Sequence, residues 1–292
     1  MANTGIGAGP ALRLAITVAI FGAAFPILKW GGEGAGPIWF AGWRAAISAA
    51  VTFLVLLPAR RLALPTRADL APVLAIGVFQ ITGFLGLLQS ALVFVPAGTS
   101  AVLSYTTGLW TVPLGIAFLG EMPDRRRLVA VLLGIAGVVV IANPWALDWS
   151  RPGLLLGHAL LLGAALSWAI AIALLRASRP RLSTLQLLPF AFLVATLLLF
   201  GMAWLFDPAG RTGHARPTLL ALAFVGVVGP LATWAASEVS RQLPAVLASM
   251  GFLAVPVVGL AAATLALGEP LSASLVAGSV LVMAGVAAAA RG

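Results

Sequence analysis

Apolar residues follow one another along this chain in runs of about 20, and each run ends at prolines, glycines or charged residues. A helix of about this length crosses roughly 30 Å of hydrocarbon and satisfies its own backbone hydrogen bonds there. The pattern predicts an all-α polytopic membrane protein with ten transmembrane helices. The expected spans are 11–30, 37–57, 71–95, 97–119, 127–144, 153–175, 184–206, 217–238, 243–267 and 271–290.

The composition agrees with a membrane protein. Hydrophobic residues make up 61 % of the 292 residues and charged residues only 9 %, whereas a soluble domain carries about 25 % charge. We therefore expect one transmembrane domain over 1–292. The formal charge is +9, but the arginines form no cluster interleaved with aromatics, so nucleic acid is not an expected partner. Most arginines fall in alternate loops, which predicts that both termini lie in the cytoplasm. The expected location is the bacterial inner membrane.

Two stretches of the chain resemble each other. The stretch 96–121 and the stretch 244–269 both begin with Pro-Ala and end with Leu-Gly-Glu. We therefore predict two repeats, 11–144 and 153–290. With an odd number of spans in each, the second repeat enters the membrane from the opposite side. Inverted repeats of this kind build transporters whose site lies near the midplane.

The stretch AVLSYTTGLWTVP, at 101–113, places hydroxyls and aromatic rings inside an apolar span. A buried hydroxyl without a partner costs about 1–3 kcal/mol, which favours a wet cavity beside this span. Tyr105 and Trp110 lie too deep for an interfacial aromatic belt, so we predict that they line the cavity. Ser104 and Thr107 could equally bond to backbone carbonyls of their own helix.

Polar or aromatic residues of other spans complete the predicted substrate-binding set. They are Gln80, Gln89, His158, Trp168, Trp234, Ser237 and Ser249. Core packing is the alternative for Trp168, and a structural hydrogen bond is the favoured role of His158. With no cysteine and two histidines far apart in the sequence, no metal site and no cofactor are expected.

Three charged residues lie near the predicted external ends of the first two spans. Lys29 and Arg44 can both extend toward the membrane surface, and Glu33 follows within reach of either. We expect an external ion pair that steadies the mouth of the cavity, and a site for a substrate carboxylate is the alternative.

Four residues at matching places of the two repeats have expected structural roles. Glu121 and Glu269 end spans four and nine, where we expect them to hold the following turns by accepting hydrogen bonds rather than to carry protons. Gly108 and Pro256 occupy equivalent positions, and either residue type loosens a helix, so a bend is expected at that level.

These features resemble the EamA-type exporters of the drug/metabolite transporter superfamily. The resemblance rests on the repeated Leu-Gly-Glu and Pro-Ala motifs, on Leu-Ser-Trp-Ala at 166–169, and on the glycine-rich fifth and tenth spans. It implies that spans one, three, four, six, eight and nine surround a central cavity. Spans five and ten would stand outside and pack closely through Gly134, Gly137, Gly278 and Gly285.

The expected function is export of amino acids or related small metabolites by alternating access. Aromatic walls suit aromatic or hydrophobic amino acids, and the resemblance to the aromatic amino-acid exporters of the family supports this preference. A multidrug or organic-cation exporter would need a carboxylate near the midplane, and a sugar-phosphate or nucleotide-sugar antiporter several deep cations; the spans show neither. An enzyme would need a catalytic constellation that the spans also lack. The expected partners are a small-molecule substrate and the lipid bilayer, and the chain could act as a monomer.

Overall fold

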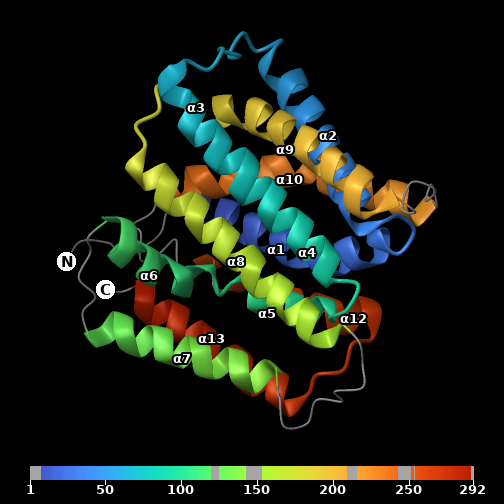
Figure 1. Cartoon of the computed structure of the whole chain (residues 1–292), viewed down its shortest axis with the longest axis vertical. Helices are drawn as coiled ribbons and strands as arrows, with labels where there is room; N and C mark the ends of the chain where they lie inside the picture. Colours follow the sequence, from blue (N-terminus) through green and yellow to red (C-terminus); the bar gives the residue numbers. More distant parts are fainter. Residues whose placement is uncertain are drawn as a thin grey trace.

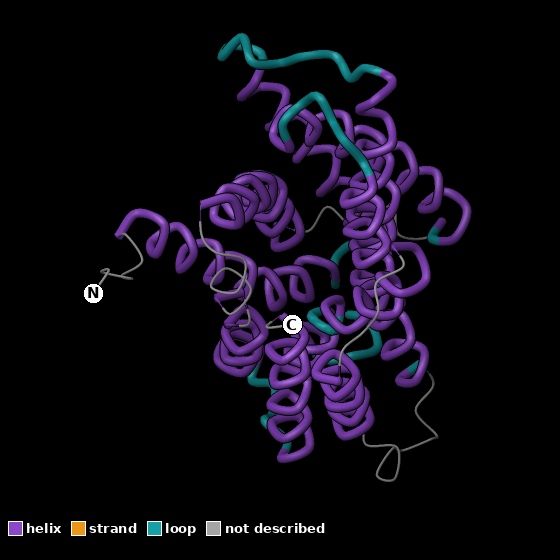
Figure 2. Tube along the Cα trace, turned by 90° about the vertical axis from the view of Figure 1, so that its left-hand side faces the viewer, coloured by secondary structure: helices purple, strands orange, loops and turns teal. Residues whose placement is uncertain are grey.

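The computed structural model describes residues 8–119, 125–142, 153–208, 216–242, 251–252 and 254–290. Within these ranges the chain forms helices and short connections and no strand (Figures 1 and 2). The helices are α1 (Ala8–Gly32), α2 (Pro37–Leu56), α3 (Arg67–Leu74), the π-helix η1 (Ala75–Gly83), α4 (Phe84–Ala91), α5 (Ala97–Ser104), α6 (Thr107–Leu119), α7 (Arg125–Ala142), α8 (Leu154–Ala177), α9 (Thr184–Phe206), α10 (Arg216–Gln242), α12 (Ala254–Leu267) and α13 (Ala273–Ala290). The all-helical prediction is confirmed.

Among the described residues, six helical segments are long and apolar enough to cross a membrane. They are Leu12–Gly32, Pro37–Leu56, Arg67–Ala91, Leu154–Ala177, Thr184–Phe206 and Arg216–Ala236. Shorter apolar helices occupy Leu128–Ile141, Ala254–Leu267 and Ala273–Ala288. Every range predicted as a span therefore contains a helix, because a polypeptide in lipid must satisfy its backbone hydrogen bonds internally.

The helix predicted over 97–119 is interrupted. α5 ends at Ser104, Tyr105 has φ −82° and ψ 0°, and α6 begins at Thr107. The N–H groups of Tyr105 and Thr106 donate to carbonyls three residues earlier instead of four, at 3.1 Å each. The helix is therefore irregular at Tyr105 and Thr106, before Gly108, where the bend was expected. Hydroxyl side chains near the break can bond to nearby backbone carbonyls and so compete with helical hydrogen bonds.

A π-helix interrupts the helical rod formed by α3, η1 and α4. Inside η1, the Thr82 hydroxyl donates to the carbonyl of Gly77 at 2.7 Å. The carbonyl of Phe79 accepts a hydrogen bond from Ser167 of α8 at 2.8 Å. The widened turn therefore has both an internal support and a partner on the neighbouring helix. π-Helical turns are rare and often mark functional sites.

Alternate connections gather at opposite ends of the helices. At one end, which we call the Asp69 end, the Asp69 carboxylate accepts hydrogen bonds from the N–H groups of Arg181, at 2.7 Å, and Leu182, at 3.0 Å. At the other, the Asp207 end, the Trp39 indole donates to the carbonyl of Asp207 at 2.7 Å. These contacts join the starts of α3 and α2 to segments more than one hundred residues away, as expected for a chain that crosses back and forth.

α7 and α13 lie side by side along one edge of the molecule (Figure 1). A Cβ built on Gly137 would lie 2.7 Å from the backbone nitrogen of Val282, and one built on Gly285 would lie 2.7 Å from the carbonyl oxygen of Ala130. Only glycine permits this approach, so the glycines expected to suit close helix packing bring α7 and α13 together.

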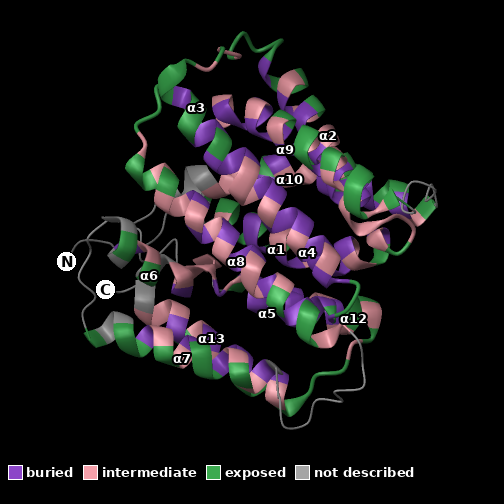
Figure 3. Cartoon of the chain, viewed as in Figure 1, coloured by how far each residue is buried: buried purple, intermediate pink, exposed green. Residues whose placement is uncertain are grey.

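Buried and exposed residues alternate along the helices (Figure 3). Many of the exposed residues have large apolar side chains. Leu132 of α7, Leu197 of α9 and Leu265 of α12, for example, are 66 %, 67 % and 87 % exposed. Outward-facing leucine is stable in hydrocarbon but not in water. The helices therefore present many apolar side chains outside, while polar residues such as Gln89, Ser104 and Thr106 are buried.

Candidate functional site

A cavity of about 480 Å³ lies among the helices. Its walls come from α1, α2, η1, α4, the α5–α6 break, α8, α9 and α10, with single residues from the stretch 251–252 and from α13. This volume suits a small organic molecule. Aromatic side chains are prominent in the lining: Phe21, Phe25, Phe84, Tyr105, Trp168, Phe192 and Phe252.

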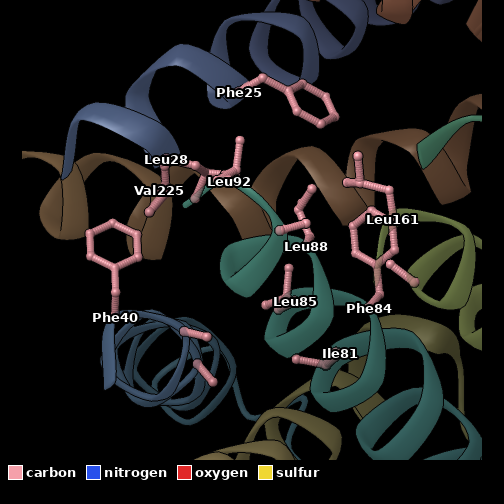
Figure 4. Close-up of a cluster of buried hydrophobic side chains, with 14 of the residues drawn as sticks. Phe25, Leu28, Phe40, Ile81, Phe84, Leu85, Leu88, Leu92, Leu161 and Val225 are labelled. Carbon is pink, nitrogen blue, oxygen red and sulfur yellow. The ribbon is translucent and has the colours of Figure 1, made fainter. Parts of the chain in front are cut away.

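The aromatic wall has a defined geometry where α4 meets α8. The rings of Phe84 and Trp168 lie edge to face, with their centroids 4.6 Å apart and an interplanar angle of 84°. Figure 4 shows Phe84 and Leu88 extending from α4 toward α1, which carries Phe25. Such surfaces favour stacking and apolar contact with a ligand.

Polar side chains also reach the cavity. Ser104 donates its hydroxyl hydrogen to the carbonyl of Ser100 at 2.6 Å, and Thr107 donates to the carbonyl of Ser104 at 3.0 Å. Ser48 of α2 donates to the carbonyl of Gly226 in α10 at 2.9 Å. Both expectations for Ser104 and Thr107 therefore hold together: they line the cavity and bond to their own segment, leaving their oxygen lone pairs as acceptors.

Five residues of the predicted site line this cavity: Gln80, Ser104, Tyr105, Thr107 and Trp168. Two irregular backbone segments position three of them. η1 carries Gln80, and the α5–α6 break carries Tyr105 next to Ser104. Trp168 follows Ser167, whose bond to the carbonyl of Phe79 fixes α8 against η1.

Four predicted residues lie away from the cavity lining. Gln89 donates to the carbonyl of Leu28 at 2.9 Å, and His158 Nδ1 lies 2.8 Å from the carbonyl oxygen of Leu154. Trp110 lies in α6 and is absent from the cavity lining; five residues after Tyr105, it would lie about 140° around a regular helix from that ring. Trp234 is 41 % exposed on the outer surface, because it lies about 100° around the helix from the cavity-lining Thr233.

Other expectations fall outside the described part of the chain. Glu121 and Ser249 are not among the described residues, and neither is the side chain of Ser237. Pro256 is buried in α12, and Gly108 lines the cavity.

The ion pair at the end of α1 differs from the expected one. Lys29 Nζ lies 3.2 Å from Glu269 Oε1. The Glu269 carboxylate also accepts hydrogen bonds from the N–H groups of Ala97, at 2.7 Å, and Gly98, at 2.9 Å. We call this set of contacts the Glu269 clamp. The predicted pairing with Glu33 is wrong, since Glu33 is exposed and the clamp supplies Lys29 with a carboxylate distant in sequence.

Glu269 does accept backbone hydrogen bonds, but from the start of α5 rather than from its own turn. The N-terminus of a helix attracts a carboxylate because its first N–H groups lack partners within the helix. Glu269 therefore caps α5 from the other half of the chain.

The cavity wall also departs from the expected set of spans. α2 supplies Arg44 and Ser48, and α9 supplies Leu188 and Phe192. α13 contributes Val286, so it does not stand wholly outside. Sequence reasoning assigned Arg44 to the mouth and did not single out the phenylalanines, because an inward-facing phenylalanine resembles any other core residue in sequence.

A profile of the EamA-like transporter family matches the chain twice, over residues 10–143 and 155–291. The chain belongs to the EamA-like transporter family. It is therefore a membrane transporter, of a family that moves small molecules.

Named relatives cover nearly the whole chain. A probable amino-acid metabolite efflux pump of Salmonella typhimurium is 29 % identical over 287 residues, covering 93 % of this chain and 91 % of the relative. A protein of the same name from Escherichia coli is 29 % identical over 283 residues, with the same coverage. The uncharacterized transporter YvbV of Bacillus subtilis is 26 % identical over 278 residues, covering 94 % of this chain and 90 % of the relative.

A solved crystal structure shares the fold. It covers 96 % of both chains with a TM-score of 0.61 and 20 % sequence identity. At this identity the likeness concerns the arrangement of helices alone.

Proposed function

We propose that this protein exports amino acids or related small metabolites across the bacterial inner membrane, with a preference for aromatic or hydrophobic side chains. The observation that carries the proposal is the cavity of about 480 Å³ walled by aromatic rings and hydroxyl oxygens. The names of the Salmonella and Escherichia relatives support amino-acid metabolites as the substrate class.

The proposed architecture is ten transmembrane helices in two inverted repeats, 11–144 and 153–290, with both termini in the cytoplasm. The double match of the family profile, over 10–143 and 155–291, supports the repeats. Under this topology the Asp69 end is cytoplasmic and the Asp207 end is external. Such repeats allow one cavity to open alternately to either side.

The Glu269 clamp is the proposed external closure. Around it, α1, α5 and α12 pack through glycines: a Cβ on Gly259 would lie 2.7 Å from that of Ala101, and one on Gly22 would lie 2.7 Å from that of Val258. The clamp joins Lys29 and α5 of the first half to Glu269 of the second. Its opening would separate the two halves at the external end.

Organic-cation efflux is the weaker alternative. Among the described residues that line the cavity, the only charged side chain is that of Arg44, and none is acidic. A cationic substrate would meet repulsion rather than a counter-charge.

Transport in proteoliposomes tests the proposal. The Tyr105→Ala and Trp168→Ala variants remove aromatic wall, and stacking of this kind is worth about 0.5–1.5 kcal/mol. Export of phenylalanine and tryptophan should fall several-fold, while export of alanine or threonine should fall less. Trp110→Ala is the matched control, because Trp110 lies in the same segment but outside the lining. Equal losses in all three variants, or for large and small substrates alike, would contradict the proposed site.

A further inference from the structure

The cavity contains a cation, Arg44, that has no partner among the residues that the structure describes. Arg44 lies seven residues after the first residue of α2, Pro37, and its side chain lines the cavity. Within the described part of the chain, its guanidinium has neither a hydrogen bond nor an ion pair. An arginine inside a membrane protein is costly and usually finds a partner. This arrangement suggests that the partner is the ligand.

The surroundings of Arg44 hold it toward the cavity. One turn further along α2, Ser48 bonds to the carbonyl of Gly226 at 2.9 Å, which ties α2 to α10. A Cβ built on Gly229 would lie 3.7 Å from an Arg44 guanidinium nitrogen. The absence of a side chain at Gly229 therefore leaves space beside the guanidinium. Gly229 itself lines the cavity, so this space opens into it.

Lys29 provides a comparison within the same protein. Its ammonium group is paired with Glu269 at 3.2 Å. Arg44 has no equivalent carboxylate among the described lining residues. Arginine presents parallel N–H donors whose geometry matches the two oxygens of a carboxylate, and such bidentate pairs are strong outside bulk water.

We propose that Arg44 is the anion subsite of the cavity and binds the carboxylate of the transported metabolite. The inference rests on the proposed function, since it assumes that this cavity holds the substrate. The aromatic wall then receives the apolar part of the same molecule. Because no acidic side chain of the described lining faces the cavity, the subsite recognises the carboxylate and not the ammonium group. Aromatic carboxylates without an amino group therefore belong to the substrate class.

Binding to the purified full-length protein tests this without transport. The probes are 3-phenylpropanoate, which has the carboxylate alone, phenylalanine, which has both charged groups, and phenethylamine, which has the ammonium alone. Affinity is measured by ligand-induced thermal stabilisation. We expect 3-phenylpropanoate to bind at least as tightly as phenylalanine and phenethylamine to bind weakest. Tightest binding of phenethylamine would overturn the proposal.

Variants locate the subsite. Arg44→Gln should weaken binding of 3-phenylpropanoate about ten- to hundredfold, the range for a lost hydrogen bond to a charged group. Arg44→Lys should retain part of the affinity for 3-phenylpropanoate, because it keeps the positive charge. Arg67→Gln is the control, because Arg67 is exposed at the start of α3. Unchanged affinity in Arg44→Gln would refute the subsite, and the melting temperature of the unliganded variant shows that it is folded.

A substitution at Gly229 tests the position independently. Gly229→Asp places a tethered carboxylate beside the guanidinium and should compete with the ligand, whereas the isosteric Gly229→Asn should bind 3-phenylpropanoate more tightly than the Asp variant. Equal affinities would count against the subsite.

The two proposals fail in different ways. If Trp168→Ala weakens binding of 3-phenylpropanoate and Arg44→Gln does not, the cavity is the site but the anion subsite is wrong. If neither variant changes binding, the cavity itself is not the site.

Discussion

Weakening the Glu269 clamp should open the external end of the cavity. In the structure, one carboxylate accepts two backbone hydrogen bonds from the N-terminus of α5 and pairs with Lys29. Glu269→Ala removes all three contacts and leaves the N–H groups of Ala97 and Gly98 without this partner. Glu269→Gln keeps an oxygen that can accept one of the two backbone bonds.

The magnitude follows from these contacts. A hydrogen bond to a charged group contributes about 1.5–3 kcal/mol, and a partly exposed ion pair about 0.2–1 kcal/mol. When the clamp opens, water replaces part of these hydrogen bonds. We therefore expect the free energy that favours the closed state to fall by about 3 kcal/mol in the Ala variant and about 1.5 kcal/mol in the Gln variant. At 1.4 kcal/mol per factor of ten, the ratio of closed to open states falls roughly a hundredfold and tenfold.

Cysteine accessibility measures this ratio directly, because the natural chain contains no cysteine. A Thr107→Cys reporter faces the cavity and reacts with a membrane-impermeant thiol reagent added outside sealed cells. Its external labelling rate should rise about tenfold with Glu269→Gln and up to a hundredfold with Glu269→Ala. Glu33→Gln, which neutralises an exposed acidic residue beyond the end of α1, should leave the rate unchanged. Equal rates in all backgrounds would refute the clamp as the external closure.

Three further outcomes are expected. Single cysteines replacing Asp124 and Ser272 should label from opposite faces of sealed cells, and labelling from the same face would contradict the inverted topology. Gly285→Leu should lower the melting temperature, because overpacking costs about 1–3 kcal/mol. The control Ala284→Leu, at the exposed neighbouring position, should leave the melting temperature unchanged. Equal melting temperatures in the two variants would contradict the close α7–α13 contact. Ser167→Ala should also lower the melting temperature, since the carbonyl of Phe79 in η1 loses its hydrogen-bond donor at a cost of about 1–3 kcal/mol. An unchanged melting temperature would show that this bond does not stabilise the fold.

Apolar run length predicted where the helices lie, because hydrocarbon permits almost no other backbone structure. The length of the runs could not predict which helix faces contact one another. Tyr105 and Trp110 occur in one apolar span, and a continuous helix would relate them by its regular period. Residues five apart in such a helix lie about 140° around it, so the two rings would not share a face, and only Tyr105 lines the cavity.

Local sequence patterns also could not predict ion pairs between residues far apart in the chain. Lys29 and Glu269 are 240 residues apart, whereas Glu33 is close in sequence and offered an apparently simpler partner. Arg44 illustrates a related limit. Its position near one end of a span is compatible with reaching the membrane surface or turning inward, and only the neighbouring α10, with Gly229 beside the guanidinium, distinguishes the two.

α5 connects the clamp to the cavity. It contains eight residues, all buried, and spans roughly 12 Å at 1.5 Å per residue. Glu269 holds its first N–H groups, and the cavity-lining Ser104 and Tyr105 lie at its opposite end. Because the break separates α5 from α6, α5 can tilt without moving the rest of that span as one rod. We therefore expect release of the clamp and displacement of Tyr105 to occur together, which would link external opening to the aromatic wall that contacts the substrate.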